Sequence, residues 1–139
     1  MFKYHVSFVL TTLMLASTGF CESVISGDSP LLPRIPAKII YVADYLAKGG
    51  DPQDKAKAIQ SAIDAAESAG GGVVELPSGN LLSGPLRLAS KIDLRVPVGT
   101  TLTMLPLDRY PGGTKTPPTF IEADHLHDVS ISGGGTIEG

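Results

Sequence analysis

The sequence predicts an all-β solenoid, in which short parallel strands stack in coils behind one amphipathic helix. Three observations predict it: one helical pattern early in the chain, short alternating apolar clusters after it, and a unit that recurs after roughly 20 residues. The length of 139 residues allows one domain or part of one. A β-sandwich, with a turn about every 8–12 residues, is the alternative fold.

Residues 1–22 match a secretory signal peptide. Lys3 gives a positive start, residues 6–16 are mostly apolar, and small residues follow. The apolar stretch is shorter than the roughly 20 residues of a transmembrane helix, and a buried N-terminal helix is the alternative. Phe20 is large where a lipoprotein signal needs a small residue, which disfavours lipidation of Cys21. We expect a secreted or periplasmic protein that makes no membrane contact after cleavage.

Residues 23–36 contain three prolines with glycine and serine, and they are typical of an extended linker. A β-branched stretch at 37–43 then predicts the first strand. From residue 37 to residue 139 we expect a single β-solenoid region.

The only helical period predicts a capping helix at about 52–69. Asp51 can cap its N-terminus, Pro52 suits the first helical position, and three glycines follow its end. A helix with one apolar face can cover the open end of a solenoid. Its apolar stripe consists of Ile59, Ala62, Ile63 and Ala66.

The remaining apolar residues come in short clusters, and residues 92–96 alternate with the period of a strand. Residues 76–81 are similar to 96–102, and 135–137 are similar to the end of that unit. The glycines that we align are Gly79, Gly99 and Gly135. A proline- and glycine-rich stretch at about 105–118 predicts a loop inserted into one coil.

Composition excludes several functions. The formal charge is −3 and the cations are scattered, which argues against nucleic acid as a partner. The chain has no tryptophan and four each of tyrosine and phenylalanine, too few for a base-stacking platform. One cysteine is insufficient for a disulfide scaffold or a cysteine zinc site.

Two carboxylate pairs are candidates for acid–base chemistry, Glu122 with Asp124 and Asp124 with Asp128. An inverting glycosidase holds its two carboxyl groups about 6.5–9.5 Å apart to admit a water. Glu122 and Asp124 would share one face of a strand. The more ordinary interpretation is that all three are solvated charges at an edge.

Other polar residues carry weaker signals. His125 and His127 are two residues apart and would lie on the same face of a strand. Two ligands are too few for a typical metal site, so we expect no metal and no cofactor. Gly133–Gly135 lacks the lysine of a phosphate loop and predicts a tight coil turn. Surface cations could meet an acidic polysaccharide or serve solubility alone; they are Arg87, Arg109 and Lys115.

Several segments resemble the pectin-degrading right-handed β-helix enzymes, and the best fit is glycoside hydrolase family 28, the polygalacturonases and their relatives. The resemblance covers residues 38–139 and rests on the segments 41–49, 58–66, 70–79, 81–102 and 129–139. It implies a right-handed, single-stranded parallel β-helix of the pectin-lyase-like type. It also implies inverting hydrolysis of α-1,4-galacturonan, an acidic plant polysaccharide, by the full-length parent.

The sequence departs from that family at the catalytic motifs. Asn-x-Asp, Asp-Asp, Gly-His-Gly and Arg-x-Lys are all missing: Asn80 precedes two leucines, and Arg34 is followed two residues later by Pro36. Near the cap, Leu46 stands where the family commonly has glycine, and 49–54 differs from its Gly-Asp-Gly turn. We therefore assign no catalytic or substrate-binding residue. We expect an N-terminal portion of the enzyme, truncated at its C-terminal end, inactive alone and monomeric.

Three alternatives on the same fold stay open. A pectate-lyase-like enzyme would use a cation and release an unsaturated product. A rhamnogalacturonan-active enzyme would share the same coils. A non-catalytic β-helix adhesin segment would bind without cleaving.

Overall fold

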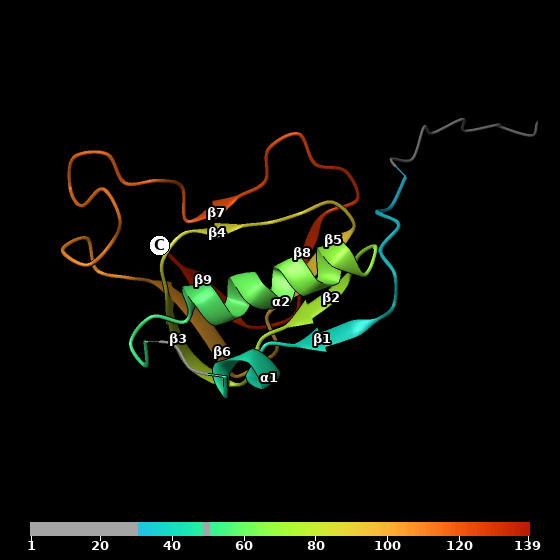
Figure 1. Ribbon diagram of the computed structural model, residues 1–139, viewed down its shortest axis with the longest axis horizontal. Coiled ribbons are helices and arrows are strands. Elements are labelled where there is room, and N and C mark those ends of the chain that lie inside the picture. The colour runs from blue at the N-terminus through green and yellow to red at the C-terminus, as the bar shows by residue number, and fades with distance from the viewer. Residues whose placement is uncertain (1–30, 49–50) are drawn as a thin grey trace, which may run out of the picture. The chain divides into compact units, whose positions relative to one another are not determined.

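The computed structural model describes residues 31–48 and 51–139 (Figure 1). The predicted signal peptide, Cys21 and the first part of the predicted linker lie outside these residues. Within them, no helix has the length and apolar character needed to cross a membrane.

Short strands dominate the described chain, with two helices near its start. The helices are α1 (Ala43–Leu46) and α2 (Ala56–Ser68). The strands are β1 (Ile39–Tyr41), β2 (Gly72–Glu75), β3 (Gly79–Ser83), β4 (Leu86–Arg87), β5 (Ile92–Arg95), β6 (Thr100–Met104), β7 (Ile121–Glu122), β8 (Ser130–Ser132) and β9 (Thr136–Glu138).

The strands form three parallel sheets that the chain visits in turn (Figure 1). Sheet A has the order β1-β2-β5-β8, sheet B the order β3-β6-β9, and sheet C pairs β4 with β7. We call each passage through the sheets a coil: β2–β4 form the first, β5–β7 the second and β8–β9 the third. Every pairing is parallel, which excludes the sandwich alternative because its sheets are antiparallel.

The repeat predicted from the glycines is one residue out of register in the second coil. In sheet B, Gly79 pairs with Thr100, and its N–H donates to the carbonyl of Gly99. The turn before β6 is therefore one residue longer than the turn before β3. Within the second coil, between β6 and β7, residues 105–120 contain no strand, which matches the position of the predicted insertion.

The core lies inside the coils and under α2. The predicted stripe of α2 is buried as expected: Ile59, Ala62, Ile63 and Ala66 are all fully inaccessible. The helix packs against β1, β2, β4 and β5. Alternate strand residues supply the rest of the interior, with Ile92, Leu94 and Leu102 among the fully buried side chains.

The predicted start of the capping helix is wrong. The helix begins at Ala56, and Asp54 rather than Asp51 accepts from its first turn, with Oδ1 2.8 Å from the Ala56 N–H. The cause is a tertiary contact. Lys55 N–H donates to the carbonyl of Leu82 at 2.8 Å, and the same Asp54 oxygen accepts the N–H of Gly84 at 3.0 Å. These bonds hold residues 54–55 against the end of β3, so the helix begins only after them.

The predicted strand at 37–43 and the expectation of a single helix are also corrected. The strand ends at Tyr41, and α1 follows as one turn of four residues. Such a turn is shorter than any window in which a helical period could be seen. Val42, directly before this turn, is fully buried, and Leu46 packs against the core.

We expect Ile63→Val to lower the free energy of unfolding by about 1 kcal/mol, because the loss of one buried methylene leaves a cavity under α2. The measurement is urea denaturation followed by circular dichroism. The matched control is Ile39→Val, whose side chain is 40% exposed and which should cost less than about 0.5 kcal/mol. Equal losses would contradict the assignment of α2 as the core cap.

Candidate functional site

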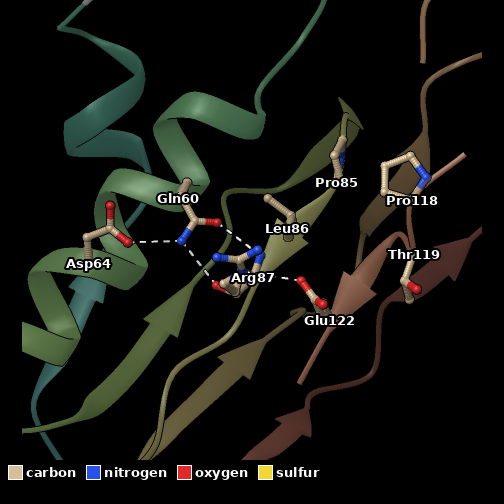
Figure 2. Close-up of a pocket in the computed structure, with 8 residues that line it drawn as sticks. All are labelled: Gln60, Asp64, Pro85, Leu86, Arg87, Pro118, Thr119 and Glu122. Carbon is tan, nitrogen blue, oxygen red and sulfur yellow. Dashed lines mark hydrogen bonds and ion pairs between the residues drawn. The ribbon is translucent and has the colours of Figure 1, made fainter. Parts of the chain in front are cut away.

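A polar groove lies between α2, β4 and the segment that leads into β7 (Figure 2). Its volume is about 460 Å³. We call it the Arg87 groove, and it is lined by Gln60, Asp64, Pro85, Leu86, Arg87, Pro118, Thr119 and Glu122. Two smaller hollows of about 270 and 220 Å³ adjoin it and share Arg87.

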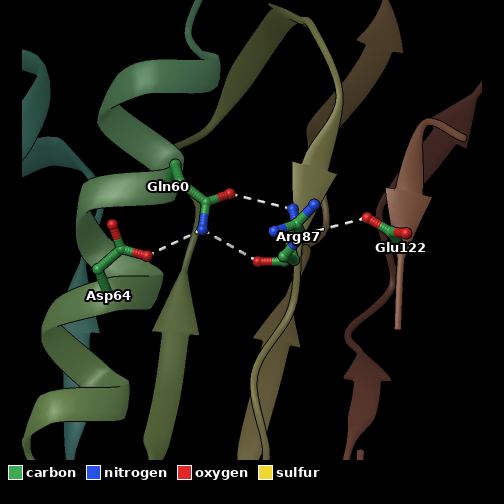
Figure 3. A network of polar contacts seen from close by, with 4 residues as sticks. All are labelled: Gln60, Asp64, Arg87 and Glu122. Atoms are coloured by element: carbon green, nitrogen blue, oxygen red, sulfur yellow. Dashed lines mark hydrogen bonds and ion pairs between the residues drawn. The ribbon is translucent and has the colours of Figure 1, made fainter. Parts of the chain in front are cut away.

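The floor of the groove is an edge strand held by a side chain (Figure 3). The N–H groups of the residues on either side of Arg87 donate to the carbonyls of Phe120 and Glu122, so the N–H and C=O of Arg87 itself face α2. The Gln60 amide pairs with both: its Oε1 accepts the Arg87 N–H at 3.0 Å, and its Nε2 donates to the Arg87 carbonyl at 3.1 Å. Gln60 therefore takes the place of a neighbouring strand and closes the edge of sheet C.

The Arg87 side chain pairs across the strands with Glu122 (Figure 3). Nε lies 3.2 Å from Glu122 Oε2, and the two side chains are 79% and 48% exposed. An ion pair this exposed adds at most about 1 kcal/mol to stability. Within the described residues, NH1 and NH2 of Arg87 make no hydrogen bond, so they point donors at solvent in the groove.

Glu122 and Asp124 line one hollow, but β7 ends at Glu122, so the two do not share a face of one strand as predicted, and they are not arranged as an acid and a base. Glu122 holds Arg87, and Asp124 Oδ1 lies 2.7 Å from Nδ1 of the neighbouring His125. A general acid needs a carboxyl group shielded from water and from cations. Both of these carboxylates are wet and paired, so this arrangement suits binding rather than proton transfer.

The other carboxylate candidate, Asp128, serves the chain itself. Its Oδ1 accepts the backbone N–H of Arg34 at 2.8 Å, and its Oδ2 lies 3.0 Å from Nδ1 of His127. The Arg34 N–H, with His127 as a second contributor, holds the pKa of Asp128 below its usual value. Each histidine thus contacts the aspartate beside it. In the described ranges, no three histidine, cysteine or acidic residues gather as metal ligands.

The three candidate cations do not converge. Arg109 donates to Oε1 of Gln53 at 2.6 Å, and Lys115 is exposed on the inserted segment. Only Arg87 lines the groove.

The glycines at 133–135 form a tight turn, as expected. Gly133 has φ +108°, and a Cβ there would collide with the carbonyl oxygen of Val96 in the coil below. A Cβ at Gly135 would lie 2.5 Å from the carbonyl oxygen of Pro97. Close stacking of the second and third coils requires glycine at both positions.

One polar cluster was missed in the sequence. Asp93 is only 6% exposed and accepts hydroxyl hydrogen bonds from Ser130 at 2.6 Å and Ser132 at 2.7 Å. Arg95 lies 3.7 Å from the same carboxylate. Alternation places Asp93 on the outer face of β5, but only the register identifies β8 as its neighbour. The cluster joins the second coil to the third.

No protein-family model matches the chain. It is similar to the solved structure of a hyperthermoactive exopolygalacturonase from Thermotoga maritima, with 27% identity and a TM-score of 0.65 over 78% of this chain and 26% of that one. It is also similar to a family 28 exopolygalacturonase from Yersinia enterocolitica, with 28% identity and a TM-score of 0.58 over 75% of this chain and 21% of that one. Alginate lyase 7 from Azotobacter vinelandii is 60% identical over 38 residues, which are 27% of this chain and 4% of that protein.

These likenesses confirm the resemblance to pectin-degrading right-handed β-helix proteins, with family 28 as the best fit. The chain spans about a quarter or less of each of these two exopolygalacturonases.

We expect Gln60→Leu to destabilise the chain by about 1 kcal/mol, because it leaves the Arg87 N–H and C=O without their partner. Urea denaturation measures the loss. The control is Gln53→Leu, which removes a hydrogen bond between two exposed side chains and should cost less than about 0.5 kcal/mol. A loss as large in the control would show that Gln60 does not close the edge.

We expect Asp128→Asn to destabilise the protein near neutral pH and to have a shrinking effect in acid. Because the pKa of Asp128 is lower in the folded state, its contribution is present above the unfolded value of about 3.9 and is lost as the pH falls through the folded value. Asparagine tolerates the φ of +56° at this position. Unfolding curves of both proteins from pH 7 to pH 2 measure the difference, and a pH-independent difference would contradict this cause.

Proposed function

We propose that this chain forms the N-terminal cap and first coils of a right-handed, single-stranded parallel β-helix in a secreted, pectin-degrading glycoside hydrolase. The observation that carries the proposal is the likeness to the Thermotoga maritima exopolygalacturonase over 78% of this chain. The order of the three parallel sheets supports it, because stacked coils of this kind build a β-helix.

The proposed activity of the whole enzyme is hydrolysis of α-1,4-galacturonan by an inverting pair of carboxylates. An acid protonates the leaving oxygen while a base activates water on the opposite face of the sugar. The carboxylates described above are paired with neighbouring side chains, and the sequence lacks all four catalytic motifs of the family. We therefore propose that the catalytic groups belong to further coils and that this chain alone is inactive.

A lyase is the second candidate, and the short match to an alginate lyase favours it. A lyase removes a proton beside the carboxylate of a uronic acid and leaves an unsaturated product. That product absorbs in the ultraviolet, whereas a hydrolase releases a reducing sugar without a new double bond.

We expect the purified chain to release no reducing sugar from polygalacturonic acid above the level of a heat-denatured sample. The physical reason is that residues 31–48 and 51–139 hold no shielded acid with a base placed across a water from it. The same assay followed in the ultraviolet tests for lyase activity. Release of reducing sugar or unsaturated product by the pure chain would contradict the proposal of inactivity.

A second measurement tests the proposed parent. The genomic DNA after the codon for Gly139 should continue in frame and encode Asn-x-Asp, Asp-Asp and Gly-His-Gly. A stop codon directly after Gly139 would overturn the proposal of an enzyme built on this chain.

A further inference from the structure

We propose that the Arg87 groove binds a neutral, hydroxyl-rich saccharide, at a place separate from galacturonan cleavage (Figure 2). The volume of about 460 Å³ lies within the range of roughly 300–1,000 Å³ for small-molecule sites. The groove is open to solvent, so a saccharide can enter it without a change in the fold.

The polar groups of the groove complement sugar hydroxyls. A hydroxyl both donates and accepts, so it pairs best where donors and acceptors alternate. Arg87 offers NH1 and NH2 as donors, and Asp64 and Glu122 offer carboxylate oxygens as acceptors on either side of it. Pro85 and Pro118 provide apolar surface for the C–H face of a sugar ring.

Charge selects against an acidic sugar. The groove carries two carboxylates, Asp64 and Glu122, against the one guanidinium of Arg87. Its net charge is therefore negative, and part of the Arg87 charge is already neutralised by Glu122 at 3.2 Å. The negative charge of the groove would repel a polyanionic ligand, whereas it would not repel a neutral saccharide.

The site is also organised before any ligand arrives. Gln60 holds the backbone of Arg87 through two hydrogen bonds, Asp64 orients the Gln60 amide at 2.9 Å, and Glu122 restrains the guanidinium (Figure 3). Groups fixed in advance lose less entropy on binding. The network therefore fixes the position of Arg87 and leaves its NH1 and NH2 available to a ligand.

Nitrogen-15 NMR of the full 139-residue chain tests the proposal with two matched probes, α-1,4-galactotriose and α-1,4-trigalacturonate. The probes differ only at C6, where a hydroxymethyl group replaces a carboxylate. The reporters are the Arg87 Nε–H and the Gln60 side-chain amide. We expect saturable shifts of both with galactotriose, and binding of trigalacturonate at least about fivefold weaker at low salt.

Variants separate the groove from the rest of the surface. Arg87→Met should weaken galactotriose binding about tenfold, since it removes the charged donors. It keeps the backbone bonds to Gln60, so the amide spectrum should remain that of a folded chain. The matched control is Arg109→Met, which removes an exposed arginine outside the groove and should leave binding unchanged.

Three results would overturn the proposal: no shift with galactotriose, tighter binding of trigalacturonate, or an equal loss in both arginine variants. None of them depends on whether a longer enzyme cleaves galacturonan. Failure of this inference and failure of the proposed function are therefore distinguishable.

Discussion

The structure depends on the closure of three strand edges at the start of the stack. Stacked parallel coils leave unpaired N–H and C=O groups on the outer edges of the three strands of the first coil, and such edges recruit other chains. Here β1 pairs with β2, residues 54–55 bond to Leu82 and Gly84 at the end of β3, and the Gln60 amide bonds to β4. One segment of chain thus bonds to all three strands of the first coil while α2 covers the apolar interior.

The same closure creates the groove. The Gln60 amide bonds to the backbone of Arg87, and this holds α2 against β4. The Arg87 side chain is left on the outer surface, where the next coil supplies Glu122. A feature that stabilises the fold therefore also positions the charged groups that the groove presents.

The prediction succeeded where one residue type or one period carries the information. The apolar stripe of α2 and the alternation of β5 are local patterns, and the apolar residues of both are buried as expected. The prediction of the helix start failed, because Asp54 accepts a hydrogen bond from Gly84, thirty residues later in the chain, and a local pattern does not reveal that contact. The roles of Gln60 and Asp93 were missed for the same reason: the partner of each lies 27 and 37 residues away along the chain.

The sequence by itself determined the strand content, the capping helix and the absence of the family's catalytic motifs, because these follow from local periodicity and from the residues present. Only the tertiary structure decided the register between coils. That register makes Thr100 rather than Gly99 the partner of Gly79, and it brings Ser130 to Asp93 and Glu122 to Arg87. The register between coils depends on the lengths of all the turns and insertions between the paired strands. A period seen along the chain does not give those lengths.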